Sequence, residues 1–442
     1  PCADSAQGRK VFQQMLIVLI AFTALLLIGM PVAFAIGISG ALFFAQHPEL
    51  PSTIPIQLTV TETQNFALLA VPLFILAGNF LNNSGITHNL LKLAGVLTGR
   101  LHGALAQTSI ALSTLMSGVT GSSIADAAMN ARIIGLQMLK RGYSRGYAAG
   151  VISYGSLLAP IIPPGIGFIL YGTVGQVSIG RLFAAGIIPG LMIWAALAIT
   201  ISITARRRGY GPERDKAPTV KEVARATWGG IWAILFPIIL LAGLRYGIFT
   251  PSEIGAFAVV YAIAVGVFAH RMLTLAGFRE AVEGSLVDVG SVMFLLALSA
   301  VFGYGIVFER IPEVITDWLL GITDDANVVM ALIVIFILLA GTFMEGSVLI
   351  IMLTPIFLPI MMKYNIDPVH FGLIFIIAAT IGNYTPPVGA AMFVTCQVLR
   401  CPIGEYTRES TPFLIAVSLV TLLLIFVPDV VLVIPDWIFG PD

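Results

Sequence analysis

A polar stretch interrupts apolar sequence at residues 117–123, which read SGVTGSS and are followed by Asp126 and Asn130. A turn of this composition brings backbone carbonyls and hydroxyls close together, which suits a desolvated monovalent cation such as Na⁺. If two helix ends meet at the turn, the positive N-terminal end would also attract a carboxylate. Small residues equally permit close helix packing, so a purely structural role stays open.

A second polar stretch, GTFMEGS at 341–347, places Glu345 within a long apolar run. An ionisable side chain inside such a segment is costly to bury and therefore indicates a functional residue. The alternative, for Glu345 and Asp126 alike, is a satisfied side chain that only holds the turn closed.

Each polar stretch is followed by a proline pair, in APIIPPG at 159–165 and in GNYTPPVG at 382–389. Two consecutive prolines remove two backbone donors and bias the preceding residue away from the helix. The carbonyls of 158–160 and 381–383 then need other partners, and a bound cation is one. A simple kink is the alternative.

These features recur at a constant spacing of 223 residues. The matching pairs are Gly118 and Gly341, Ile133 and Ile356, Met138 and Met361, Lys140 and Lys363, and the proline pairs at 163–164 and 386–387. Rare features in the same order indicate an internal duplication.

The elements that position these residues must lie in lipid, because 58% of the 442 residues are hydrophobic and only 10% are charged. Soluble domains carry about a quarter charged residues. The net charge of +0 gives no reason to expect nucleic acid as a partner. The sequence has no phosphate loop, no Ser/His/Asp set and no metal-ligand spacing among its five histidines and three cysteines, so we do not expect an enzyme. The apolar stretch after residues 1–10 is too long for a signal peptide core, so we expect no cleaved signal.

A membrane-spanning helix needs about 20 apolar residues. Several apolar segments are shorter, and these fall in 101–176 and 327–399, which is typical of re-entrant hairpins and broken helices around a midplane site. The basic loop 206–225 predicts a cytoplasmic position, whereas Asp324 and Asp325 before the second hairpin fit the outside. The predicted fold class is therefore an all-α polytopic membrane protein with inverted structural repeats, two re-entrant hairpins and two broken helices.

The expected organisation has six parts. They are 1–100, scaffold helices and an amphipathic arm (82–100) of the first repeat; 101–180, its hairpin and broken helix; 181–226, a connecting helix and cytoplasmic loop; 227–323, scaffold helices and arm of the second repeat; 324–400, its hairpin and broken helix; and 401–442, a C-terminal helix. Within 227–323, we expect Glu253 at the N-terminal turn of a helix.

Stretches across nearly the whole chain resemble the large membrane subunit of tripartite ATP-independent periplasmic (TRAP) transporters. They are LAVPLFILAG at 69–78, GVTGSSIAD at 118–126, KRGY at 140–143, APIIPP at 159–164, LFAAGIIPG at 182–190, GIFTPSE at 247–253 and TPPVG at 385–389. The resemblance implies an elevator-type transporter of the bacterial inner membrane, with Na⁺ symport, a small membrane subunit and a periplasmic substrate-binding protein as partners. It implies an organic-acid substrate such as a C4-dicarboxylate or sialic acid. The chain departs from the family pattern at Gly165, where Ser is common, and at 390–392, where Ala-Ala-Met replaces Leu/Val-Asn-Leu.

The expected Na⁺ ligands come from both turns and both proline loops: Gly118, Thr120, Gly121, Ser122, Ser123, Ala159, Pro160, Pro163, Gly341, Thr342, Gly346, Gly382, Asn383, Thr385 and Pro386. The expected substrate-binding residues lie between the turns: Ser123, Asp126, Pro164, Gly165, Glu345, Pro387 and Gly389. The alternative function is a self-sufficient ion or dicarboxylate symporter of a related inverted-repeat fold, without a binding protein.

Overall fold

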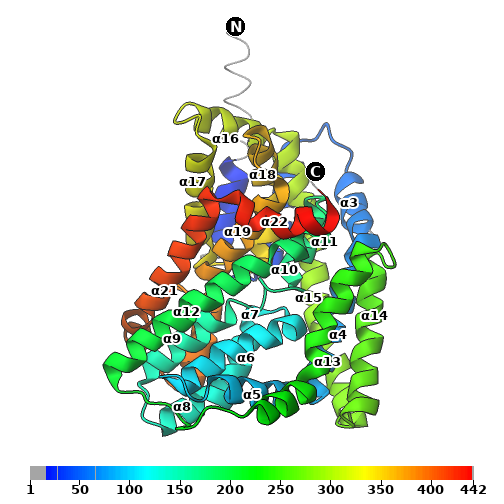
Figure 1. The fold of residues 1–442 in the computed structure, drawn as a ribbon. Helices are drawn as coiled ribbons and strands as arrows, with labels where there is room; N and C mark the ends of the chain where they lie inside the picture. The colour runs from blue at the N-terminus through cyan, green and yellow to red at the C-terminus, as the bar shows by residue number, and fades with distance from the viewer. Residues whose placement is uncertain (1–15, 27, 65, 441–442) are drawn as a thin grey trace.

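The structure, a computed structural model, describes residues 16–26, 28–64 and 66–440 (Figure 1). Among these residues every regular element is helical. Six of the helices are long and apolar enough to cross a membrane, and shorter apolar helices lie between them. The expectation for residues 1–10 lies outside the described part of the chain.

One part of the fold consists of helices that flank the polar stretches in sequence without containing them. They are α2 (Val32–Gln46), α3 (Ile54–Thr63), η1 (Phe66–Leu69), α4 (Ala70–Asn83), α5 (Ile86–Thr98), α13 (Val220–Arg245), α14 (Pro251–Ala264), η3 (Val265–Ala269), α15 (Leu275–Phe308) and α16 (Ile311–Leu320). Helix α4 packs on α14 and α15, α5 packs on α13, and α15 also contacts α2 and α3. We call this part the scaffold.

Helix α14 begins where the sequence predicts. Thr250 is its N-cap and Pro251 its first residue, and the Glu253 carboxylate accepts a hydrogen bond from the Thr250 backbone N–H at 2.8 Å. This reciprocal capping satisfies two donors that the first turn leaves open. The expectation for Glu253 is confirmed.

The other part contains both polar stretches, and we call it the hairpin part. Its first half is α6 (Ala104–Thr120), α7 (Ser123–Asn130), η2 (Ala131–Gly135), α8 (Leu136–Lys140), α9 (Arg145–Ser156), α10 (Ile166–Val174) and α11 (Ile179–Ala185). Its second half is α17 (Ala326–Gly341), α18 (Gly346–Lys363), α19 (Pro368–Gly382) and α20 (Ala390–Leu399). Helix α12 (Ile187–Arg208) and the C-terminal helices α21 (Ile403–Phe426) and α22 (Pro428–Phe439) pack beside it.

The two halves repeat the same order of elements at the spacing seen in the sequence. Helix α7 begins at 123 and α18 at 346, which is 223 residues later, and α9 begins at 145 and α19 at 368, again 223 later. The starts of α10 and α20, at 166 and 390, differ by 224. Secondary structure therefore supports the internal duplication.

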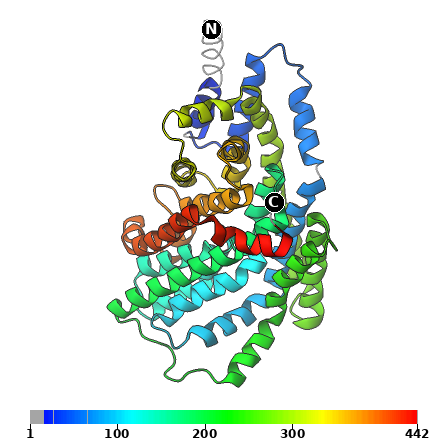
Figure 2. The same cartoon turned by 45° about the horizontal axis from the view of Figure 1, so that its top comes forward.

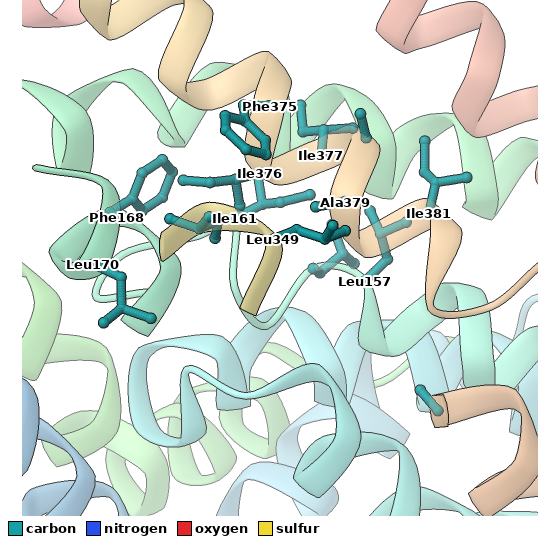
Figure 3. Packing of buried hydrophobic residues seen from close by; sticks show 14 of the residues in the cluster. Leu157, Ile161, Phe168, Leu170, Leu349, Phe375, Ile376, Ile377, Ala379 and Ile381 are labelled. Carbon is teal, nitrogen blue, oxygen red and sulfur yellow. The ribbon is translucent and has the colours of Figure 1, made fainter. Parts of the chain in front are cut away.

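The halves also pack into each other. Helix α7 contacts α20 of the other half, and α10 contacts α18. Ser153 on α9 and Thr395 on α20 share a buried hydrogen bond of 2.7 Å. Figure 3 shows the apolar packing between them, with Leu157, Ile161 and Phe168 from the first half against Phe375 and Ile376 on α19.

The C-terminal region differs from the expected single helix. Residue Val427, with φ −127° and ψ 74°, separates α21 from α22, which starts at Pro428. The proline ring restricts the residue before it to extended conformations, so the chain turns there. Figure 2 shows α22, the red helix that ends near the C-terminus, running across the body at a bend from α21, and α22 contacts α11. The prediction of one continuous helix was wrong because the apolar run continues through Pro428 and hides the break.

Candidate functional site

The first polar stretch forms a tight turn between α6 and α7. Gly121 ends α6 with φ +57°, a backbone conformation that glycine adopts readily, and Ser122 is the N-cap of α7. The Ser122 hydroxyl accepts a hydrogen bond from the Ala125 N–H at 3.5 Å. The Gly121 carbonyl accepts from the N–H of Ile166, which follows the first proline loop. The first turn therefore rests on the proline loop of its own half.

The second polar stretch is arranged in the same way between α17 and α18. Glu345 is the N-cap of α18, and its carboxylate accepts from the Ser347 N–H and the Ser347 hydroxyl, both at 3.0 Å. The Thr342 carbonyl accepts from the Gly389 N–H at 2.8 Å. The second turn thus rests on the second proline loop. Ser122 and Glu345 are 223 residues apart, so the two N-caps occupy equivalent positions.

Backbone contact at the second turn leaves no room for a side chain. A Cβ added to Gly382 at the end of α19 would lie 2.5 Å from the Gly341 Cα and 2.7 Å from the Leu338 carbonyl oxygen. Glycine is therefore required where α17 and α19 cross. Both proline pairs contain a cis peptide bond, Pro163-Pro164 and Pro386-Pro387.

A cavity of about 580 Å³ lies between the two turns and the scaffold. The hairpin part contributes polar groups from both turns, with Asn383 and Thr380 from α19 and the loop after it. The scaffold contributes Asn79 on α4 and Asp288 and Ser291 on α15. Among the described residues lining the cavity, Asp288 and Glu345 are acidic, and none is Lys, Arg or His.

The structure brings eight of the 21 predicted residues to this cavity. Those that line it are Thr120, Gly121, Ser122, Ser123, Pro160, Glu345, Gly346 and Asn383. The others are not among the lining residues, and these are Gly118, Asp126, Ala159, Pro163, Pro164, Gly165, Gly341, Thr342, Gly382, Thr385, Pro386, Pro387 and Gly389. Their assignment to Na⁺ or substrate stays a prediction.

Asp126 lies in a buried network and not in the cavity lining. Its side chain is fully buried, and its Oδ2 accepts hydrogen bonds from the Ser113 hydroxyl at 2.6 Å and the Asn130 amide at 3.1 Å. Asp126 and Asn130 are one turn apart, so both face α6. The Oδ1 of Asp126 has no hydrogen-bond partner among the described residues, so the network satisfies only one of the two carboxylate oxygens.

Asn383 also has a buried oxygen without a partner in the described part of the chain, but it belongs to the cavity lining. It is 1% exposed, it lines the cavity, and its Oδ1 has no hydrogen-bond partner among the described residues. An unpaired buried amide oxygen is costly unless a ligand satisfies it. Asn383 thus offers an open acceptor to a cation or to a donor group.

The scaffold wall is the feature that sequence reasoning missed. The Asn79 amide donates to the Ser285 hydroxyl at 2.9 Å and lies 3.5 Å from the Asp288 carboxylate, which joins α4 to α15. Asp288 could be noted only as an acid in an apolar segment, and nothing in the sequence links it to Asn79. The available signal was that each is a polar residue in a helix with a long apolar stretch.

An all-helical membrane protein whose interrupted helices enclose a polar cavity is a multi-pass membrane transporter by class. Comparison with known proteins then specifies the family. Residues 19–430 match the family model described as "Tripartite ATP-independent periplasmic transporter, DctM component", so the chain belongs to this family. The resemblance seen in the sequence is confirmed. Members of the family are integral inner-membrane permeases, and this confirms the prediction that the chain is a transporter and not an enzyme.

Individual relatives cover most of the chain. The 2,3-diketo-L-gulonate TRAP transporter large permease protein of Escherichia coli is 33% identical over 93% of this chain and 96% of its own length. The C4-dicarboxylate TRAP transporter large permease protein of Pseudomonas aeruginosa is 32% identical over 91% and 94%. The isethionate TRAP transporter permease protein DctMQ of Oleidesulfovibrio alaskensis is 33% identical over 92% of this chain, which spans only 64% of that protein.

A solved structure resembles the fold. The crystal structure of the Alcanivorax borkumensis YdaH transporter superposes with a TM-score of 0.65 at 16% identity, covering 87% of this chain and 89% of that one. At this identity the likeness concerns the fold alone, and it confirms the predicted class of an all-α polytopic membrane transporter.

Proposed function

We propose that this chain is the large membrane subunit of a Na⁺-coupled importer of organic acids. The observation that carries the proposal is the cavity between two equivalent turns, each resting on its own proline loop. The sequence has no nucleotide-binding loop, so an ion gradient is the available source of energy. Relatives are named for 2,3-diketo-L-gulonate, C4-dicarboxylates and isethionate, all of them organic anions.

Two groups of oxygen atoms would bind Na⁺. The first comprises the carbonyls and hydroxyls of 118–123 with the loop 159–165, and the second those of 341–346 with the loop 382–387. Hard monovalent cations prefer oxygen ligands, and unwound backbone at helix breaks supplies carbonyls for them. The unpaired Asn383 Oδ1 supports the second group, because Na⁺ would satisfy it.

Transport would proceed by an elevator movement of the hairpin part against the scaffold. The cavity supports this because its two walls belong to different parts of the fold: Asn79 and Asp288 to the scaffold, and both turns to the hairpin part. The two halves would be inverted relative to each other, as the charge pattern predicts. The movement would then carry substrate between the two membrane faces.

Two protein partners complete the proposal. A periplasmic binding protein would deliver the substrate, and a small membrane subunit would enlarge the scaffold. The length of the DctMQ relative, of which this chain spans 64%, leaves room for such a further part in that protein.

Uptake into proteoliposomes tests the proposal. The chain is reconstituted with the proposed small membrane subunit and periplasmic binding protein, and uptake of labelled organic acids is measured across a Na⁺ titration. Thr120→Val, Ser122→Ala and Thr385→Val should raise the half-saturating Na⁺ concentration about tenfold, since each ligand oxygen is worth on the order of 1 kcal/mol.

Thr411→Val is the matched control for Thr385→Val. Each hydroxyl donates to the carbonyl four residues earlier, at 2.7 Å in Thr411 and 2.9 Å in Thr385, but Thr411 is exposed on α21. Unchanged Na⁺ titrations in all three site variants would refute the Na⁺ assignment. Equal uptake without the binding protein would favour the self-sufficient symporter.

A further inference from the structure

The two equivalent turns differ in the residue at the helix N-cap, which is neutral in one turn and acidic in the other. Ser122 is the neutral N-cap of α7, whereas Glu345, the residue 223 positions later, is the N-cap of α18. Both line the cavity. A helix N-terminus carries about half a positive charge and attracts a carboxylate. The two turns therefore offer different environments to an anion.

At α18 the carboxylate is supplied by the chain itself. Glu345 accepts hydrogen bonds through both of its oxygens, one from the Ser347 N–H and one from the Ser347 hydroxyl. These are the donors that would hold a substrate carboxylate there. The α18 N-terminus is thus already occupied, and its partial charge is compensated.

At α7 the N-terminal donors are weakly engaged. The Ser122 hydroxyl accepts from the Ala125 N–H at 3.5 Å, at the limit of a hydrogen bond. Residues Gly121 to Ala125 all line the cavity, so this helix end faces it directly. One substrate carboxylate can bind here.

The cavity lining also contains further acceptors besides Glu345. Asp288 on the scaffold adds a second carboxylate, and Asn383 contributes its unpaired Oδ1. No basic residue is found among the described lining residues. Like charges in a cavity of low dielectric repel each other strongly. A second substrate carboxylate near Glu345 and Asp288 would lie beside two acidic side chains with no basic residue among the described lining residues to neutralise it, whereas hydroxyl groups could donate to both of them.

We propose that the cavity selects monocarboxylates with several hydroxyl groups over dicarboxylates, with Glu345 as the residue that excludes the second carboxylate. The inference rests on the proposed function, since it assigns the substrate class of the same cavity. The substrate carboxylate binds at Ser122 to Ala125, and its hydroxyl groups donate to Glu345 and Asp288.

Matched ligand pairs test this inference by direct binding to the purified full-length chain in detergent with Na⁺. Glycerate and tartronate, threonate and tartrate, and gluconate and glucarate differ within each pair only in a hydroxymethyl or carboxylate end. Apparent affinities come from thermal unfolding across a ligand titration. We expect the monocarboxylate of the best-binding pair to bind about tenfold more tightly than its partner, the effect of one like-charge contact.

Glu345→Ser gives the second turn the same kind of cap as the first, and serine preserves the N-cap, so the variant should fold. It should reduce the ratio of affinities to about one, because the α18 N-terminus becomes free for a carboxylate. Glu313→Gln on the exposed face of α16 removes a charge outside the cavity and should leave the ratio unchanged.

The outcomes separate the two proposals. Equal binding of both members in the unaltered protein, or a ratio that Glu345→Ser does not change, overturns the selection by Glu345 while organic-acid transport stands. Absence of binding by every member of the three pairs overturns both the selection and the organic-acid proposal.

Discussion

Replacement of Gly382 by alanine should separate the second turn from its proline loop. The added Cβ would lie 2.5 Å from the Gly341 Cα, 2.6 Å from the Gly341 carbonyl carbon and 2.7 Å from the Leu338 carbonyl oxygen. All three are backbone atoms, so no side chain can rotate away. Carbon atoms pack at about 3.5–4.0 Å, so α17 and α19 must move apart by about 1 Å.

The expected loss of stability is about 1–3 kcal/mol, the usual effect of overpacking a rigid site. The displacement also moves the Thr342 carbonyl, which accepts from the Gly389 N–H, and so disturbs the second group of proposed Na⁺ ligands. Thermal unfolding of the purified chain, with and without Na⁺, measures both effects. We expect a lower melting temperature and a smaller Na⁺-dependent increase than in the unaltered protein.

Gly404→Ala provides the control. Gly404 lies in α21 and is exposed, and a Cβ there would meet no atom within 4 Å. Its replacement should be neutral or stabilising by up to about 1 kcal/mol. If Gly382→Ala and Gly404→Ala melt at the same temperature, the conclusion that α17 and α19 cross too closely for a side chain at residue 382 is wrong.

Two further predictions concern polar contacts away from the cavity lining. Ser113→Ala should lower the free energy of unfolding by about 1–3 kcal/mol, because it removes a hydrogen-bond donor from the fully buried Asp126 carboxylate. The melting temperature measures this loss, and an unaltered melting temperature would contradict the network. Asp436→Asn should weaken the attachment of α22 to α11 by about 1 kcal/mol, since Arg181 pairs with Asp436 at 2.8 Å in a half-exposed contact. Faster proteolysis of the C-terminal helix measures this effect, and unchanged proteolysis would count against it.

Local sequence was sufficient to predict the turns and the helices around them. Glycine, serine and proline define their own backbone geometry, so residues 117–123 and 159–165 mark interruptions whatever surrounds them. The capping of α14 by Thr250 and Glu253 is equally local. The internal duplication then allowed the second turn and the second proline loop to be predicted as equivalents of the first. These features needed no knowledge of tertiary packing.

Contacts between distant helices could not be predicted in the same way. The approach of Asn79 to Asp288 depends on α4 lying against α15, and no local sequence pattern specifies which two distant helices pack together. The position of Asp126 depended on helical rotation: its i, i+4 relation to Asn130 directs it to α6 and away from the cavity. The break at Pro428 was hidden because hydropathy alone does not distinguish one bent segment from two helices.

The exchange of contacts between the halves has a mechanical consequence. Because α7 packs on α20 and α10 on α18, each turn is braced by the half that carries the other turn. A force applied at one turn is transmitted to the other through buried contacts such as Ser153 to Thr395. The two turns therefore cannot be released one at a time without breaking this packing. In the proposed elevator movement, both turns would therefore move together as one body.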